Sequence, residues 1–87
     1  MYSFIYQERG AVKLGNHLRQ LRFEHDQISQ QALANAVGVT RLTIHSIEAG
    51  KFFPSALLAM KIARFFGKTV EEVFYIVEED DQTTRRG

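Results

Sequence analysis

The chain has 87 residues, of which 45% are hydrophobic and 24% charged, and its eleven Lys and Arg residues nearly balance ten Asp and Glu residues. A chain this short has room for one small domain with a single core, which leaves no separate effector domain and argues against an enzyme. The absence of cysteine excludes disulfides, thiolate zinc sites and cysteine nucleophiles, and no apolar run approaches the ~18 to 20 residues of a membrane span, so we expect a cytoplasmic protein.

From Lys13 onward the apolar residues recur at helical spacing, and short segments with cap or turn residues separate the helical stretches. In the first stretch, Leu14, Leu18 and Leu21 fall on one face. Later stretches begin after a good N-cap or end at a glycine, which reaches a positive φ without strain. The sequence therefore predicts an all-α fold, a compact five-helix bundle with helices over residues 13–24, 30–37, 41–49, 56–66 and 70–77.

The two ends differ in composition from this body, so we expect the domain to span residues 13–77. Residues 1–12 contain Tyr2, Phe4, Ile5 and Tyr6, which predicts either a short strand or arm that packs on a partner subunit or a leader that precedes the domain. Residues 78–87 are acidic and then polar, as expected of a solvated tail. A less favoured interpretation makes them an interaction tail or a damper of nonspecific DNA binding.

The segment 30–49 has the spacing of a helix-turn-helix. An eight-residue helix, the turn Gly38-Val39-Thr40 and a second helix follow one another, and two helices so joined must cross steeply. Ala34 is small enough for the close crossing, and Ile44 and Ile47 complete the contact. The second helix can then project into the ~12 Å wide major groove of DNA.

The order of motifs between Leu14 and about Asp80 resembles the Cro/C1-type (XRE) family of lambda-repressor-like transcription regulators. The matching pieces are 18–22 (LRQLR), 28–34 (ISQQALA), 38–41 (GVTR), 47–51 (IEAGK) and 54–55 (PS). One departure is the link 24–27, which is about one residue longer than is usual in the family and lacks its glycine. This leaves the orientation of the first helix less well defined.

The resemblance implies that Gln30 contacts a DNA phosphate and that Thr40, Arg41, Leu42, Thr43 and Ser46 read bases or hold the backbone. The residues themselves agree with these roles. Arg41 can offer paired donors to guanine or grip a phosphate, Thr43 and Ser46 can donate to bases or phosphates, and Leu42 suits a thymine methyl group. His45 lies on the same outward face, and Lys51 can reach the backbone, whereas Arg19, Lys13 and Lys61 are equally well explained as solvated charges.

Other residues are expected to have structural roles or none. The family often pairs an arginine of the first helix with the glutamate that closes the recognition helix, here Arg22 with Glu48, which would fix orientation. The spacing of His17, His25 and His45 fits no metal site, and no catalytic constellation or cofactor motif is present.

These features together predict sequence-specific binding of a double-stranded DNA operator by a transcriptional regulator, most simply a repressor that associates with the nucleoid when bound. Such a protein would act as a homodimer, through helix 70–77 and, as a second contact, the N-terminal arm. The alternative is an antitoxin or adaptor whose main partner is a protein. Residues 11–66 hold seven Lys and Arg against three Asp and Glu, whereas residues 67–87 hold three against six. The net charge of the whole chain is therefore small, although the segment expected to bind DNA is basic.

Overall fold

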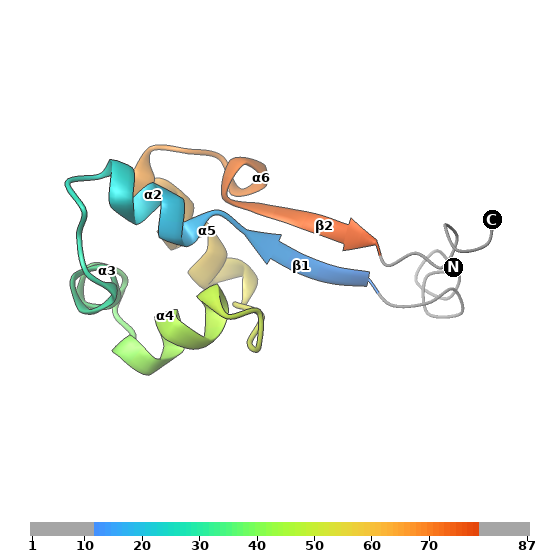
Figure 1. The fold of residues 1–87 in the computed structure, drawn as a ribbon, viewed down its shortest axis with the longest axis horizontal. Coiled ribbons are helices and arrows are strands. Elements are labelled where there is room, and N and C mark those ends of the chain that lie inside the picture. Colours follow the sequence, from blue (N-terminus) through green and yellow to red (C-terminus); the bar gives the residue numbers. More distant parts are fainter. Residues whose placement is uncertain (1–11, 79–87) are drawn as a thin grey trace.

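The structure, a computed structural model, describes residues 12–78. The elements in chain order are β1 (Val12–Asn16), α2 (Leu18–Glu24), α3 (Gln30–Val37), α4 (Arg41–Glu48), α5 (Ala56–Phe66), α6 (Val70–Val73) and β2 (Phe74–Glu78). The five helices pack together, and the two strands form a ribbon that projects from them (Figure 1). The expected helical fold is confirmed, with a small sheet added to it.

The first and last helices are shorter than the apolar spacing predicted. The first was expected over 13–24 but begins at Leu18, and the last was expected over 70–77 but ends at Val73, with antiparallel strands in place of the lost turns. Lys13 pairs with Val77 and Gly15 with Tyr75 in this ribbon. The run 74–77 is aromatic and β-branched, so it fits a strand better than a helix.

Packing at the ribbon explains why the first helix does not extend back to Lys13. A Cβ added at Gly15 would lie 2.5 Å from Cζ of Tyr75, so only glycine lets the Tyr75 ring lie against this backbone. The next residue, Asn16, lies two positions before the first residue of α2, and its Oδ1 accepts a hydrogen bond from the Leu18 N–H at 3.1 Å. Val77, in the exposed part of β2, keeps 39% of its surface open to solvent.

The expected arm and tail, 1–12 and 78–87, fall almost wholly outside the described residues. Val12 and Glu78 are the exceptions, and they form the last pair of the ribbon. Among residues 12–78, no helix has the length and apolar character that crossing a membrane requires.

The core lies between the helices and includes Leu18, Leu21, Ala34, Ile44 and Ile47, which were predicted to face inward. Its fully buried large side chains come from five elements, namely Leu18, Leu33, Ile44, Ile47, Ile62 and Val73. Four of the helices begin at a hydroxyl N-cap that accepts a hydrogen bond from a backbone N–H three residues on, and these caps are Ser29, Thr40, Ser55 and Thr69. These four helices thus start where the sequence predicted.

The unusual link between the first two helices adopts a left-handed turn. Asp26 and Gln27 have φ values of 61° and 55°, a region that favours glycine. The turn closes with a hydrogen bond from the Ile28 N–H to the Arg22 carbonyl at 3.1 Å. The link therefore completes the turn without glycine, at the cost of backbone strain in two residues.

Candidate nucleic-acid interface

The helices α3 and α4 pack against each other, and each contributes buried side chains to the core. Ala34 is fully buried, as is Ile44, and Ile47 is nearly so. Gly38, with φ of 80°, ends α3, and its N–H donates to the Ala34 carbonyl at 2.9 Å. This turn fixes the direction in which α4 leaves the body and holds its inner face against α3.

The opposite face of α4 is open to solvent. Arg41, Leu42 and His45 are exposed, and Leu42 retains 64% of its surface, a large value for an apolar side chain. Thr43 and Ser46 are half-buried, and Lys51 is exposed just beyond the helix. The residues predicted to read DNA are thus brought together on and next to one helix face.

Thr40 and Thr43 are coupled at the start of α4. Oγ1 of Thr40 accepts from the Thr43 N–H at 3.2 Å and lies 3.0 Å from Oγ1 of Thr43, so one hydroxyl donates to the other. Thr40 therefore serves the helix as its N-cap, whatever further contact it makes.

Arg22 and Glu48 form a close, largely buried ion pair. Nε of Arg22 lies 2.7 Å from Oε2 of Glu48, Nη2 donates to Oε1 at 3.1 Å, and the side chains are 17% and 9% exposed. Nη1 of Arg22 donates to the Ile28 carbonyl at 2.8 Å. The pair therefore ties α2 to the end of α4 and to the segment that leads into α3.

Gln30 joins this ion pair to the exposed face of α4. Its Nε2 donates to Oε1 of Glu48 at 3.1 Å, and its Oε1 accepts from Nη1 of Arg41 at 3.2 Å. A primary amide has two N–H donors and a guanidinium has five, so both side chains keep donors that these two hydrogen bonds do not use. A continuous chain of hydrogen bonds thus runs from Arg22 to Arg41.

Asn16, which was not among the predicted site residues, also contacts α4. Nδ2 of Asn16 donates to the Ile47 carbonyl at 2.9 Å while its Oδ1 holds the start of α2. An Asn just before an apolar helical stretch is a recognisable cap signal. Its second contact, 31 residues away, depends on the fold and has no local signal.

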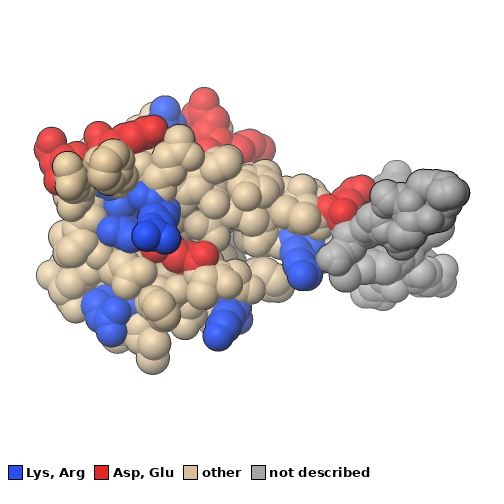
Figure 2. All heavy atoms as spheres, viewed as in Figure 1, with Lys and Arg blue, Asp and Glu red and all other residues tan. Residues whose placement is uncertain are grey.

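Charge is unevenly distributed over the surface. Figure 2 shows basic side chains over the α2 and α4 region, whereas acidic side chains gather above α2 and α6 along the upper edge of the view. The first turns of α3 and α4 contain no acidic residue, while that of α6 contains Glu71 and Glu72. Among residues 12–78, no three His, Asp or Glu side chains are grouped as a metal site.

Comparison with known proteins adds an independent finding. A helix-turn-helix family model matches residues 18–73. Over 67 residues the chain is 46% identical to an uncharacterised HTH-type transcriptional regulator of Methanocaldococcus jannaschii, covering 77% of this chain and 97% of that protein. It is also 43% identical to the HTH-type transcriptional regulator YgzD of Bacillus subtilis, over 75% of this chain and 97% of that protein. A more distant match, 33% identical, is the control protein C.MunI of a Mycoplasma species, over 79% of this chain and 93% of that protein.

Proposed function

The chain belongs to the Cro/C1-type helix-turn-helix family of DNA-binding transcriptional regulators, and from this premise we propose that it binds a specific operator by placing α4 in the major groove. One observation carries the proposal. Helix α4 buries Ile44 and Ile47 and leaves Arg41, Leu42 and His45 exposed on its outer face. An inner apolar face and an outer face of base-contacting residues are what a recognition helix needs.

The charge of Arg41 supports a role outside folding. A cation in the first turn of a helix faces the positive end of the helix dipole, which is unfavourable for stability. Arg41 is the first residue of α4, and no acidic residue in that turn offsets it. Bound DNA would supply negative charge and base acceptors at this position. Arg41 is therefore better explained by a contribution to DNA binding than by a contribution to the stability of the fold.

Gln30 would hold a backbone phosphate while Arg41 contacts a base. One N–H of the Gln30 amide stays on Glu48, and the second is free for a phosphate oxygen beside the N-terminus of α3. Oε1 of Gln30 accepts a hydrogen bond from Arg41, so the position of the Gln30 side chain and that of the Arg41 guanidinium are coupled. The phosphate contact of Gln30 and the base contact of Arg41 would therefore form together. Thr43, Ser46 and Lys51 would complete the contacts at the edge of this surface.

The protein would act as a homodimeric repressor. A helix-turn-helix dimer reads two half-sites about 34 Å apart, and occupancy of an operator that overlaps a promoter blocks transcription. The segment 70–77 was expected as a helix at the dimer contact, but only residues 70–73 are helical, and residues 74–77 belong to strand β2, where Ile76 is 66% and Val77 39% exposed. Within the described residues the sheet has two strands only, so its edges are open to antiparallel pairing with a second copy.

A binding selection from random duplex DNA tests the proposal. We expect one enriched sequence with internal two-fold symmetry, and affinity that falls steeply with salt because phosphate contacts release counterions. Sedimentation of the Ile76→Lys variant should show a monomer, with Leu57→Lys on α5 as the matched control that stays dimeric. Failure to enrich any duplex at low or high salt would refute the proposed function.

A second candidate is an antitoxin or adaptor that binds mainly another protein. A separate group of exposed apolar side chains favours it, Phe52, Phe53, Leu57 and Met60, which are 46 to 65% exposed. Exposed apolar patches often mark protein contacts. Retention of specific DNA binding by Leu57→Lys, together with an enriched operator, would favour the regulator over this candidate.

A further inference from the structure

A hollow of about 370 Å³ lies beside the proposed recognition helix. It is lined by residues of α2, the first residue of α3 and the end of α4, namely Arg19, Arg22, Gln30, His45, Glu48 and Ala49. Four of the six sit on α4 or belong to the hydrogen-bonded chain that reaches it. The hollow is therefore continuous with the surface that would face DNA.

Most polar groups in the hollow already have partners in the protein. Glu48 accepts from Arg22 and from Gln30, and Arg22 uses three nitrogens on Glu48 and the Ile28 carbonyl. The two charges of the ion pair cancel at short range. The formal charge that remains at the hollow is that of Arg19.

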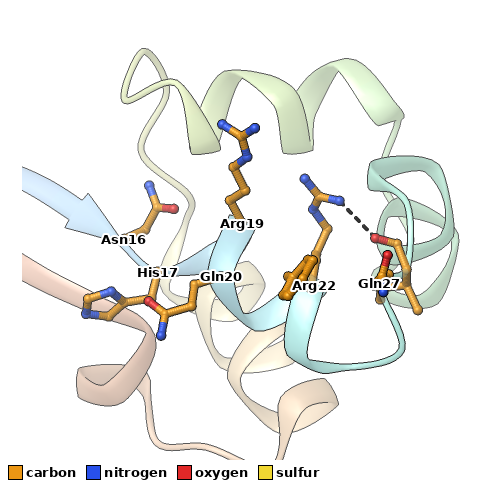
Figure 3. A pocket seen from close by; sticks show the side chains of 8 residues that line it. Asn16, His17, Arg19, Gln20, Arg22 and Gln27 are labelled. Atoms are coloured by element: carbon orange, nitrogen blue, oxygen red, sulfur yellow. Dashed lines mark hydrogen bonds between the residues drawn. The ribbon is translucent and has the colours of Figure 1, made fainter.

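Arg19 is exposed, and within residues 12–78 it has no hydrogen-bond or ion-pair partner. Figure 3 shows its guanidinium pointing from α2 toward α4, on the same side of the helix as that of Arg22. Arg19 also borders a second hollow of about 690 Å³ along α2, which polar side chains such as Gln20 and Gln27 line as well. Arg19 therefore borders both hollows, and its guanidinium can bind an anion without displacing a protein contact.

We propose that Arg19 binds a phosphate of the DNA backbone, at a site outside the helix-turn-helix segment. This inference rests on the proposed function, because α4 in the major groove brings the flanking sugar-phosphate strand past the hollow. Gln30 and Arg19 border the same hollow, so they would hold neighbouring phosphates of one strand. The planar donors of arginine suit phosphate oxygens, and a phosphate contact positions the protein without reading sequence.

The dependence of affinity on salt distinguishes this role. Removal of one phosphate contact should lower the slope of log K against log salt by about 0.9 per bound subunit, which corresponds to about an eightfold loss of affinity at 0.1 M salt. We expect Arg19→Ala to show both changes on the selected duplex and on a duplex of unrelated sequence. Arg19→Lys should restore much of the slope, because lysine keeps the charge.

Arg64→Ala is the matched control. Arg64 is an exposed arginine of α5, and the hollow that it borders contains no residue of α4. Its replacement by alanine changes the net charge by the same amount as Arg19→Ala but leaves the proposed phosphate site intact. An Arg19→Ala slope equal to that of the parent, or a changed base preference, would overturn the inference while DNA binding by the parent stands. Absence of binding by the parent itself would instead overturn the proposed function. Unchanged thermal unfolding of Arg19→Ala would exclude a folding defect.

Discussion

The ion pair between Arg22 and Glu48 should stabilise the fold mainly because neither charge tolerates the loss of its partner. The test is a double-mutant cycle that combines Arg22→Met with Glu48→Leu. Arg22→Met leaves the Glu48 carboxylate, 9% exposed, with Gln30 as its remaining side-chain donor, and it also leaves the Ile28 carbonyl without its 2.8 Å donor. Breaking a buried pair in this way costs about 3 to 5 kcal/mol, and partial exposure places our expectation near the lower limit, at about 3 kcal/mol.

The reverse substitution should cost less. Glu48→Leu leaves a guanidinium that is already 17% exposed, keeps the Ile28 carbonyl as acceptor and can turn its long side chain toward water, so we expect a loss of about 1 to 2 kcal/mol. The double variant buries no unpaired charge and should lose about 1 to 2 kcal/mol, mostly from the Ile28 carbonyl. The two single losses together therefore exceed the double loss by about 2 to 4 kcal/mol.

Urea unfolding followed by far-ultraviolet circular dichroism measures these differences. For a domain of this size, about 3 kcal/mol corresponds to a fall in Tm of roughly 12 to 24 °C, so Arg22→Met should be visibly unstable. The reasoning would be refuted if the sum of the stability losses of Arg22→Met and Glu48→Leu equalled the loss of the double variant within about 0.5 kcal/mol. Such additivity would mean that the pair is solvated in spite of its short distances.

Three further predictions concern the rest of the fold. Gln27→Gly should raise the free energy of unfolding by up to about 1 kcal/mol in the same urea assay, because glycine adopts φ of 55° without the left-handed penalty, and a loss of stability would contradict this. Gly15→Ala should cost about 0.5 to 1.5 kcal/mol, because the added Cβ forces the half-exposed Tyr75 ring out of its preferred position, and the same change in a Tyr75→Ala background should cost less, so an equal loss in both backgrounds would refute the contact. The hydrogen bond from the Thr69 N–H holds the pKa of Glu72 below its ordinary value, so its stabilisation is present above the ordinary pKa and is lost as pH falls through the lowered one. The stability difference between the parent and Glu72→Gln, measured by thermal unfolding, should shrink over that range, and a difference that grows on acidification would contradict the sign.

Local chemistry explains why most of the helices could be predicted. Ser29, Thr40, Ser55 and Thr69 each cap through a contact three residues long, and Gly38 and Gly67 end helices with φ of 80° and 68°. Such signals need no knowledge of the fold. The ranges 30–37 and 56–66 accordingly coincide with α3 and α5.

The ribbon could not be predicted from local signals, because its pairing joins residues about sixty positions apart in the chain. Leu14 has helical spacing to Leu18, yet it faces Ile76 across the ribbon. The β-branched and aromatic run 74–77 was the one local signal for a strand. It competed with a correct capping box at Thr69, which does start a helix, but one of only four residues.

The candidate site divides in the same way. The face of α4 follows from its own periodicity, so the exposure of Arg41, Leu42 and His45 was predictable. The contacts of Gln30 with Glu48 and Arg41 depend on the crossing of α3 and α4, which spacing restricts but does not determine. The position of Arg19 beside the two hollows likewise depends on the folded surface and has no local sequence signal.

Competition between the selected duplex and a copy altered at the contacted guanine, measured for the parent and for Arg41→Ala, tests the central claim most directly. Reading by α4 predicts that the parent discriminates by about 1 to 3 kcal/mol and that Arg41→Ala loses this preference, while its Tm is unchanged or slightly higher because an unfavourable helix-dipole contact is removed. Arg64→Ala, with the same change in charge, should keep the preference. An Arg41→Ala variant that discriminates as well as the parent would show that this face of α4 does not read the operator.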